Sequence, residues 1–88
     1  MNYEILGSFE NDTIKIKDKL LLKRIITAVH KIEEAADLSG LSNIKKMEGS
    51  KTHYRMRVGD YRIGLEYSNN ILHLVRFLHR KDIYKYFP

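Results

Sequence analysis

The apolar and polar positions of this chain follow two different periods, one in each half. Between Lys19 and Ala36 the apolar residues recur every three or four positions, which is typical of a helix with one buried face. The apolar set comprises Leu22, Ile25, Ile26, Val29, Ile32 and Ala36, and the polar set comprises Lys23, Thr27, His30, Lys31 and Glu34. Asp18 precedes them where an N-cap is expected. The pattern therefore predicts one amphipathic helix over residues 19–36.

From His53 onward the period changes to two, which predicts strands. We expect strands over 53–58, 61–67 and 71–78. The last of these is apolar on both faces, as expected for a central strand. The two-residue loop after Val58 and the Ser-Asn-Asn run after residue 67 are turn signals, so the three strands should be joined by tight hairpins.

The remaining segments give weaker signals. Residues 2–6 predict a short strand, 9–16 are compatible with a short helix, 41–51 form a polar connection, and 79–88 form either a short helix or irregular structure. The predicted order is β-α-α-β-β-β. It indicates a single α+β domain over residues 1–88, with two N-terminal helices packed on a twisted, mostly antiparallel four-stranded sheet.

Size and composition exclude several classes of protein. The 88 residues can form one modest core, and 43% hydrophobic with 31% charged residues argues against disorder. The absence of cysteine excludes disulfides, thiolate metal sites and a cysteine nucleophile. The first residues show no signal-peptide pattern, and no apolar run approaches the roughly twenty residues of a membrane span. We therefore expect a cytoplasmic protein.

The net charge of +5 is concentrated in two segments of the second half. Residues 45–62 contain six Lys or Arg against two Asp or Glu, and residues 76–88 contain four against one; residues 1–44 contain six against seven. This asymmetry favours an anionic partner, with nucleic acid ahead of a membrane surface. On charge alone, a basic face that serves only solubility is an equal alternative.

Three arginines meet on the first predicted hairpin. A Gly-Asp loop at 59–60 suits a primed turn, and that register sets Arg57 opposite Arg62 and Arg55 opposite Gly64. Because side chains alternate along a strand, all three arginines share one face. Like charges opposite each other destabilise a hairpin by up to about 1 kcal/mol, whereas a polyanion such as RNA would reverse that effect. We favour phosphate binding over a merely solvated face.

A second group of candidates follows the last strand. It consists of Arg76, His79, Arg80 and Tyr84. Arg80 and Tyr84 are four residues apart, so a helical turn would place them side by side. Histidine and tyrosine can exchange protons, which arginine cannot, since its pKa exceeds about 12. Together with the hairpin arginines, this group indicates phosphodiester cleavage.

Other chemistries have no clear pattern. His30, His53, His73 and His79 lack metal-ligand spacing, and no carboxylate cluster accompanies them, so we expect neither metal nor cofactor. A Gly-Ser-Lys run at 49–51 lacks the earlier glycine and the following helix of a phosphate loop.

Three stretches of the second half carry a family resemblance. They are Lys-Met-Glu-Gly-Ser at 46–50, Tyr-Arg-Met-Arg-Val-Gly-Asp-Tyr-Arg-Ile at 54–63 and His-Arg-Lys-Asp-Ile-Tyr at 79–84. With them the chain resembles the RelE/ParE superfamily of bacterial type II toxins, and its RelE branch in particular. The N-terminal strand and helices agree with that family in their order.

The resemblance implies a ribosome-dependent endoribonuclease that cleaves messenger RNA in the ribosomal A site. In RelE-type toxins the 2′-hydroxyl of the RNA attacks the adjacent phosphate, so the protein bends the RNA, neutralises charge and moves two protons. By position, the implied catalytic residues are Arg55, Arg57, Arg62, Arg80, Tyr84 and His79. Further cations of the two basic segments are expected to bind RNA: Lys45, Lys46, Lys51, Arg76 and Lys81.

This chain departs from the family pattern at three places. Arg55 and Arg57 stand where relatives often have lysine, which moves the general base to Tyr84 or His79. Leu78 replaces a common glycine, and few residues follow Tyr84. Two other functions therefore stay open: a ParE-like inhibitor of DNA gyrase, and an inactive homologue. The family also implies a cognate antitoxin that covers the basic face, and operator DNA bound only through that antitoxin.

Overall fold

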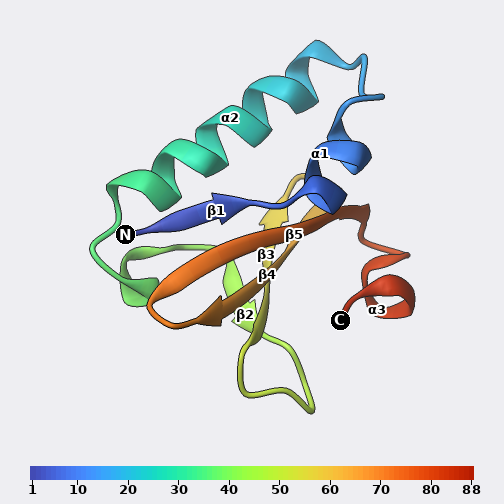
Figure 1. The fold of residues 1–88 in the computed structure, drawn as a ribbon. Coiled ribbons are helices and arrows are strands. Elements are labelled where there is room, and N and C mark those ends of the chain that lie inside the picture. Colours follow the sequence, from blue (N-terminus) through green and yellow to red (C-terminus); the bar gives the residue numbers. More distant parts are fainter.

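A computed structural model describes all 88 residues of the chain. Its elements follow the order β1 (Tyr3–Ile5), α1 (Gly7–Thr13), α2 (Lys19–Glu34), a short 3-10 turn η1 (Leu38–Gly40), β2 (Ile44–Lys46), β3 (His53–Val58), β4 (Tyr61–Ser68), β5 (Ile71–His79) and α3 (Ile83–Tyr86). Figure 1 shows α1 and α2 on one side of a twisted sheet and α3 on the other. The α+β class is confirmed.

The sheet differs from the prediction in having one more strand. It has five strands in the order β1-β5-β4-β3-β2, and β1 runs parallel to β5, so the sheet is mixed. The expected four-stranded sheet is therefore one strand short, whereas the expected mostly antiparallel pairing is found, since β2–β3, β3–β4 and β4–β5 are all antiparallel. The missed strand is β2, which lies inside the segment expected to be a polar connection. It is three residues long with one apolar side chain, too short to show alternation.

Helix α2 begins where its sequence predicts. The Asp18 carboxylate accepts hydrogen bonds from the backbone N–H groups of Leu20 and Leu21, at 2.9 and 3.2 Å, as an N-cap does. The buried face carries Ala28, whereas Ile26, expected in the core, is 57% exposed.

No helix of the protein is both long and apolar enough to cross a membrane.

The β3–β4 hairpin has the predicted register, with Arg57 opposite Arg62 and Arg55 opposite Gly64. Gly59 adopts φ 60°, a conformation that favours glycine and fits the first central position of a primed turn. Because this turn has only two residues, it leaves no freedom to the pairing that follows.

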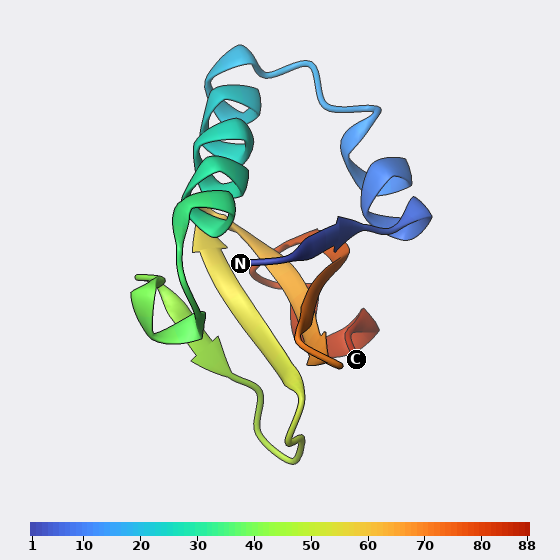
Figure 2. The same cartoon turned by 60° about the vertical axis from the view of Figure 1, so that its left-hand side comes forward.

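Two apolar clusters hold the layers together. The larger one fills the space between the sheet and the helices α1 and α2, with Phe9, Ile32 and Leu65 among its buried members. The smaller one lies on the opposite side of the sheet, where Met47, Ile83 and Phe87 pack together. Figure 2 shows α3 below the sheet and α2 above it. The second cluster therefore fixes the C-terminal segment against the face that carries the hairpin arginines.

Candidate functional site

The three hairpin arginines share the sheet face on which α3 packs. Their strand register places them there, and Arg62 is held in position by its own turn. Its Nη1 donates hydrogen bonds to the carbonyl oxygens of Gly59 and Tyr61, at 3.0 and 2.9 Å. The guanidinium makes no other hydrogen bond, so its remaining N–H groups can donate to an anionic ligand.

The end of β5 brings Arg80 and Tyr84 to the same place. The backbone N–H of Arg80 donates to the Asp60 carbonyl oxygen at 2.8 Å, which ties the segment after β5 to the hairpin turn. One turn later, α3 presents Tyr84, which is 64% exposed. Its ring centroid lies 6.0 Å from Cζ of Arg55. We refer to these five residues, Arg55, Arg57, Arg62, Arg80 and Tyr84, as the arginine–tyrosine cluster.

The electrostatics of Arg62 show how closely the cluster is gathered. Burial lowers the pKa of its guanidinium, and the positive charges of Arg55, Arg57 and Arg80 lower it further. None of the four arginines forms an ion pair with a carboxylate. The cluster is therefore an uncompensated positive site beside one exposed phenol.

His79 does not join the cluster. It is paired with Tyr61 across β4 and β5, whereas Arg62 is paired with Leu78, so His79 and Arg62 point to opposite faces of the sheet. The imidazole packs edge-on against Tyr61 at 5.3 Å between ring centroids, and its Nδ1 accepts a hydrogen bond from the Lys81 backbone at 3.2 Å. Its position does not support the expected role as general base.

Arg76 forms an ion pair with Asp12 of α1. Its Nε and one Nη donate to the carboxylate of Asp12, at 2.7 and 3.2 Å, and the backbone N–H of Phe77 donates to the same carboxylate at 2.9 Å. The Asp12 hydrogen bond raises the pKa of Arg76. Arg76 therefore fastens α1 to β5 and is not a free cation for RNA, contrary to expectation.

The four lysines expected to bind RNA are all exposed but differ in position. Lys45 lies opposite Arg55 in the β2–β3 ladder and so shares its face, whereas Lys46 lies opposite Tyr54 on the other face. Lys81 directly follows Arg80, and Lys51 lies in the loop between β2 and β3. Lys45 and Lys81 are thus the lysines that flank the cluster.

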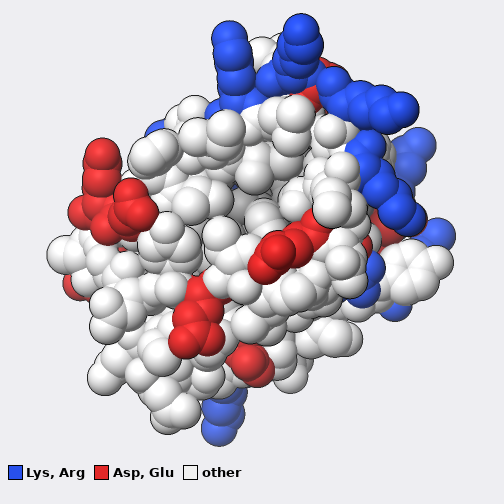
Figure 3. Space-filling view, turned by 45° about the horizontal axis from the view of Figure 1, so that its top comes forward, with Lys and Arg blue, Asp and Glu red and all other residues white.

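The sequence analysis did not identify one basic segment, which precedes and begins α2. Residues 15–24 contain Lys15, Lys17, Lys19, Lys23 and Arg24 against the single acid Asp18. Figure 3 shows Lys and Arg side chains gathered along one border of the molecule, over the loop before α2 and its first turns, with acidic side chains across the middle and opposite side. The acids elsewhere in residues 1–44 cancel the positive charge of this segment when the whole range is counted together. A charge count in shorter windows would have found it.

The chemistry available at the cluster is narrow. No group of three or more His, Asp or Glu side chains lies close enough to hold a metal ion. Arginine guanidinium groups can grip and neutralise phosphate, and the Tyr84 hydroxyl is the one group of the cluster that exchanges a proton readily. The site fits the transfer of a phosphoryl group more than any reaction that needs a carboxylate pair.

Comparison with known proteins decides the family. A family model described as the ParE toxin of the type II toxin-antitoxin system parDE matches residues 3–84. The chain belongs to the RelE/ParE toxin family. It is 43% identical over 67 residues to Toxin RelE3 of Methanocaldococcus jannaschii, a match that covers 75% of this chain and 76% of that protein.

Solved structures of this toxin family share the fold. The toxin chain of a RelB-RelE antitoxin-toxin complex from Methanococcus jannaschii matches with a TM-score of 0.78 and 34% identity, covering 96% of this chain and 98% of that one. The YoeB dimer from Staphylococcus aureus matches with a TM-score of 0.68 and 17% identity, over 90% and 95% of the two chains. The protein is thus a toxin of a type II toxin-antitoxin system.

Proposed function

We propose that this toxin is a ribosome-dependent endoribonuclease that cleaves messenger RNA and so inhibits translation. The observation that carries this proposal is the arginine–tyrosine cluster: four unpaired cations and one exposed phenol on an open face of the sheet. The nearest acid on this face is Glu66, which pairs with His53 at 3.3 Å and forms no ion pair with the arginines. An open, positive face fits a polyanionic strand better than a small substrate, which would need an enclosed pocket.

The proposed reaction uses the RNA's own nucleophile. The 2′-oxygen attacks the adjacent phosphorus and the bond to the 5′-oxygen breaks, which leaves a 2′,3′-cyclic phosphate and a free 5′-hydroxyl. One proton leaves the 2′-hydroxyl and one is delivered to the departing 5′-oxygen. Tyr84 is the group proposed to exchange a proton there, a task typically worth about 10²- to 10⁴-fold in rate.

The arginines are proposed to stabilise the charge that develops on phosphorus. Arg62 is the best placed, because two carbonyl oxygens already fix its guanidinium. Loss of one preset donor to a developing oxyanion costs about 3–4 kcal/mol elsewhere, a factor of about 10² to 10³ in rate. Arg55 and Arg57 hold the strand, and Arg80 orients it beside Tyr84.

The partner that restrains this activity is proposed to be a cognate antitoxin. The RelE structure from Methanococcus jannaschii was solved as an antitoxin-toxin complex with RelB. By analogy, an antitoxin would cover the positive face and neutralise it, and operator DNA would be bound through the antitoxin alone.

Cleavage on translating ribosomes tests the proposed function. Purified toxin is added to a translation reaction, and new mRNA ends are mapped by primer extension. We expect cuts within the A-site codon by the wild type and a loss of about 10² or more with Arg62→Ala. Intact, antitoxin-free toxin that makes no new ends would refute the proposal and point to an inactive homologue.

A second candidate follows from the matched family model, whose description names ParE. ParE-like proteins act on DNA gyrase through protein contact, without cleaving RNA. A gyrase supercoiling assay with a DNA-cleavage readout separates the two functions. Inhibition of supercoiling without any mRNA cuts would replace the ribonuclease proposal.

A further inference from the structure

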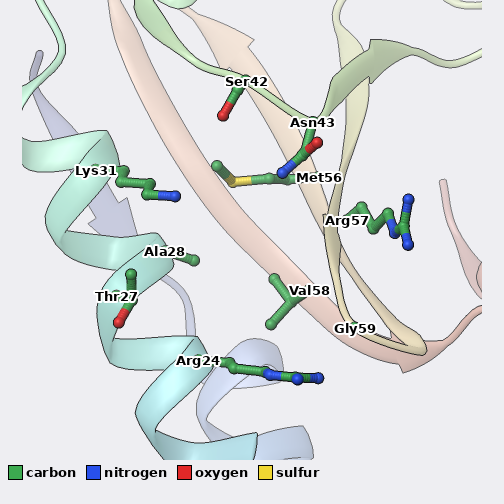
Figure 4. A pocket seen from close by; sticks show the side chains of 10 residues that line it. All are labelled: Arg24, Thr27, Ala28, Lys31, Ser42, Asn43, Met56, Arg57, Val58 and Gly59. Carbon is green, nitrogen blue, oxygen red and sulfur yellow. The ribbon is translucent and has the colours of Figure 1, made fainter.

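A cavity lies between α2 and β3, on the opposite face of the sheet from the arginine–tyrosine cluster. It has a volume of 210 Å³ and is shown in Figure 4. Its walls come from three places: the α2 side chains Arg24, Thr27 and Lys31, the loop residues Ser42 and Asn43, and the hairpin turn at Gly59. Segments from both halves of the chain therefore build one pocket.

The polar groups of this cavity are charged or neutral donors, and none is an acid. Figure 4 shows the Lys31 ammonium and the side chains of Ser42 and Asn43 directed into it, while Arg24 closes the end beneath Gly59. Neither Arg24 nor Lys31 forms an ion pair. Two unpaired cations on one helix face, with hydroxyl and amide donors opposite, form a site for an anionic group.

The guanidinium of Arg57 takes no part in this site. Arg57 lines the cavity, but Figure 4 shows its side chain pointing away from α2. The cavity is therefore a second positive site, on the opposite side of the hairpin from the cluster. The two sites meet at the turn, where a Cβ built on Gly59 would lie 2.7 Å from Nη1 of Arg24.

The bottom of the cavity is apolar. It consists of Ala28, Met56 and Val58, which belong to the main core. The small side chain of Ala28 leaves room between helix and strand. Asn43 adopts φ 60° and its carbonyl oxygen accepts a hydrogen bond from the Arg57 backbone at 2.9 Å, which fixes the loop that presents its amide.

We propose that this cavity binds one nucleotide, with the phosphate between Arg24 and Lys31 and the base against Met56 and Val58. Met56 and Val58 are 3% and 5% exposed, so a base would contact the small apolar surface that they present to the cavity, which a bare phosphate would leave uncovered. The amide of Asn43 offers a donor and an acceptor side by side, the combination that reads the edge of an unstacked base. The nucleotide can be free or part of an RNA strand.

Where the bound nucleotide is part of an RNA strand, its binding rests on the proposed ribonuclease function. A strand held by the cluster would cross the hairpin turn and place a neighbouring nucleotide in the cavity. The cavity would then contribute to the choice of sequence around the cut. Such reading of a splayed base is how proteins commonly obtain specificity for single-stranded RNA.

Binding is measured without ribosomes, on the full chain carrying Tyr84→Phe so that RNA is not cut. The probes are inorganic phosphate, the four nucleoside 5′-monophosphates and a short single-stranded RNA, and the readout is the NMR shift of the Met56 methyl and the Asn43 side-chain amide. We expect saturable shifts with nucleotides and RNA, and weaker binding of phosphate. Equal binding of phosphate and nucleotides, or no shift at these two groups, would overturn the site.

Three variants make the assignment specific. Lys31→Gln should weaken nucleotide binding about tenfold by removing a charged donor. Asn43→Gly keeps the left-handed backbone and should reduce the differences among the four bases. Lys23→Gln removes an exposed lysine that does not line the cavity, so it should change the affinity for a mononucleotide less than about twofold. Equal weakening by Lys23→Gln and Lys31→Gln would reduce the effect to general charge and overturn the proposal.

The outcomes also separate this inference from the proposed function. Mononucleotide binding without RNA binding would assign the cavity to a free nucleotide and refute its place beside the cleavage site. Absence of ribosomal cuts refutes the proposed function but leaves the mononucleotide site standing.

Discussion

At the residue scale, the hairpin arginines set folding stability against function. The lowered pKa of Arg62 means that its charged form is less favourable in the fold than in the unfolded chain. The sign is that of a depressed cation: the penalty is constant at neutral pH and is relieved only as the pH rises toward the ordinary pKa of arginine. Folding therefore carries an electrostatic cost under all working conditions.

Replacing Arg57 by glutamine should relieve part of that cost. Arg57 lies directly opposite Arg62, so we expect Arg57→Gln to stabilise the fold by a few tenths to about 1 kcal/mol at low salt, and less at high salt. The free energy of unfolding in urea measures this. Lys46→Gln, on the other face of the sheet, is the matched control and should change little. A loss of stability with Arg57→Gln would show that the arginines do not repel each other.

Asp12 should matter for stability and not for cleavage. Its carboxylate holds both the Arg76 guanidinium and the Phe77 backbone, so Asp12→Ala leaves a half-buried cation without its partner. We expect a loss of about 1–3 kcal/mol in urea unfolding. Cleavage per folded molecule should stay within about twofold, because the Arg76 guanidinium is held by Asp12 of α1. A strong loss of cleavage at full stability would restore Arg76 to the RNA-binding set.

At the scale of elements, α3 is a short helix that depends on its packing. It has four residues, too few to be stable alone, and is held by Ile83 and Phe87. The Phe87 ring lies over Gly64, where a Cβ would come within 2.8 Å of ring carbons. Gly64 thus provides the space in which the C-terminal segment docks and Tyr84 is placed.

Gly64→Ala should consequently displace α3. We expect cleavage to fall about 10- to 100-fold from misplacement of Tyr84, with a stability loss of about 1–3 kcal/mol. Adding Phe87→Leu, a smaller side chain, should restore part of the activity. Gly7→Ala, at a glycine with open space around it, is the control. Unchanged cleavage with Gly64→Ala would mean that Tyr84 does not need this docking.

The pairing of β3 with β4 could be predicted from the sequence, whereas the pairing of β4 with β5 could not. The hairpin register followed from a two-residue turn, and with it the common face of Arg55, Arg57 and Arg62. His79 was grouped with Arg80 and Tyr84 from its place in the sequence, but the β4–β5 pairing shifts by one residue at Gly64/Leu65 and turns it away from them. Without that shift, His79 would lie on the face of Arg62; such an irregularity reverses the face of every later residue and leaves no clear pattern in the sequence.

Contacts between side chains far apart in the sequence could not be predicted either. Arg76 meets Asp12, 64 positions earlier, only because α1 packs on β5. The cavity beside α2 also joins distant segments, and its residues Thr27 and Lys31 were expected to form a merely solvated helix face. In both cases the residue type was plain from the sequence, but its neighbours depended on tertiary packing.

At the scale of the whole molecule, the hydrophobic core and the arginine–tyrosine cluster are separated by the sheet. The main core and both N-terminal helices lie on one side of the sheet, and the arginine–tyrosine cluster lies on the other, flanked by Lys45 and Lys81. The basic border over residues 15–24 extends the positive surface to the start of α2. An RNA strand that contacts both the cluster and this border should bind with an affinity that falls steeply with salt.

The proposed ribonuclease function depends on Tyr84 acting beside the arginines on ribosome-bound RNA. The most direct measurement compares wild type, Tyr84→Phe and Tyr86→Phe for mRNA cleavage on programmed ribosomes, with the 2′,3′-cyclic phosphate as the product detected. Both tyrosines lie on α3 and are similarly exposed, at 64% and 61%, so neither change should alter stability. We predict a loss of about 10² or more with Tyr84→Phe and activity within about twofold of wild type with Tyr86→Phe. Equal cleavage by all three proteins would contradict the assignment of the site.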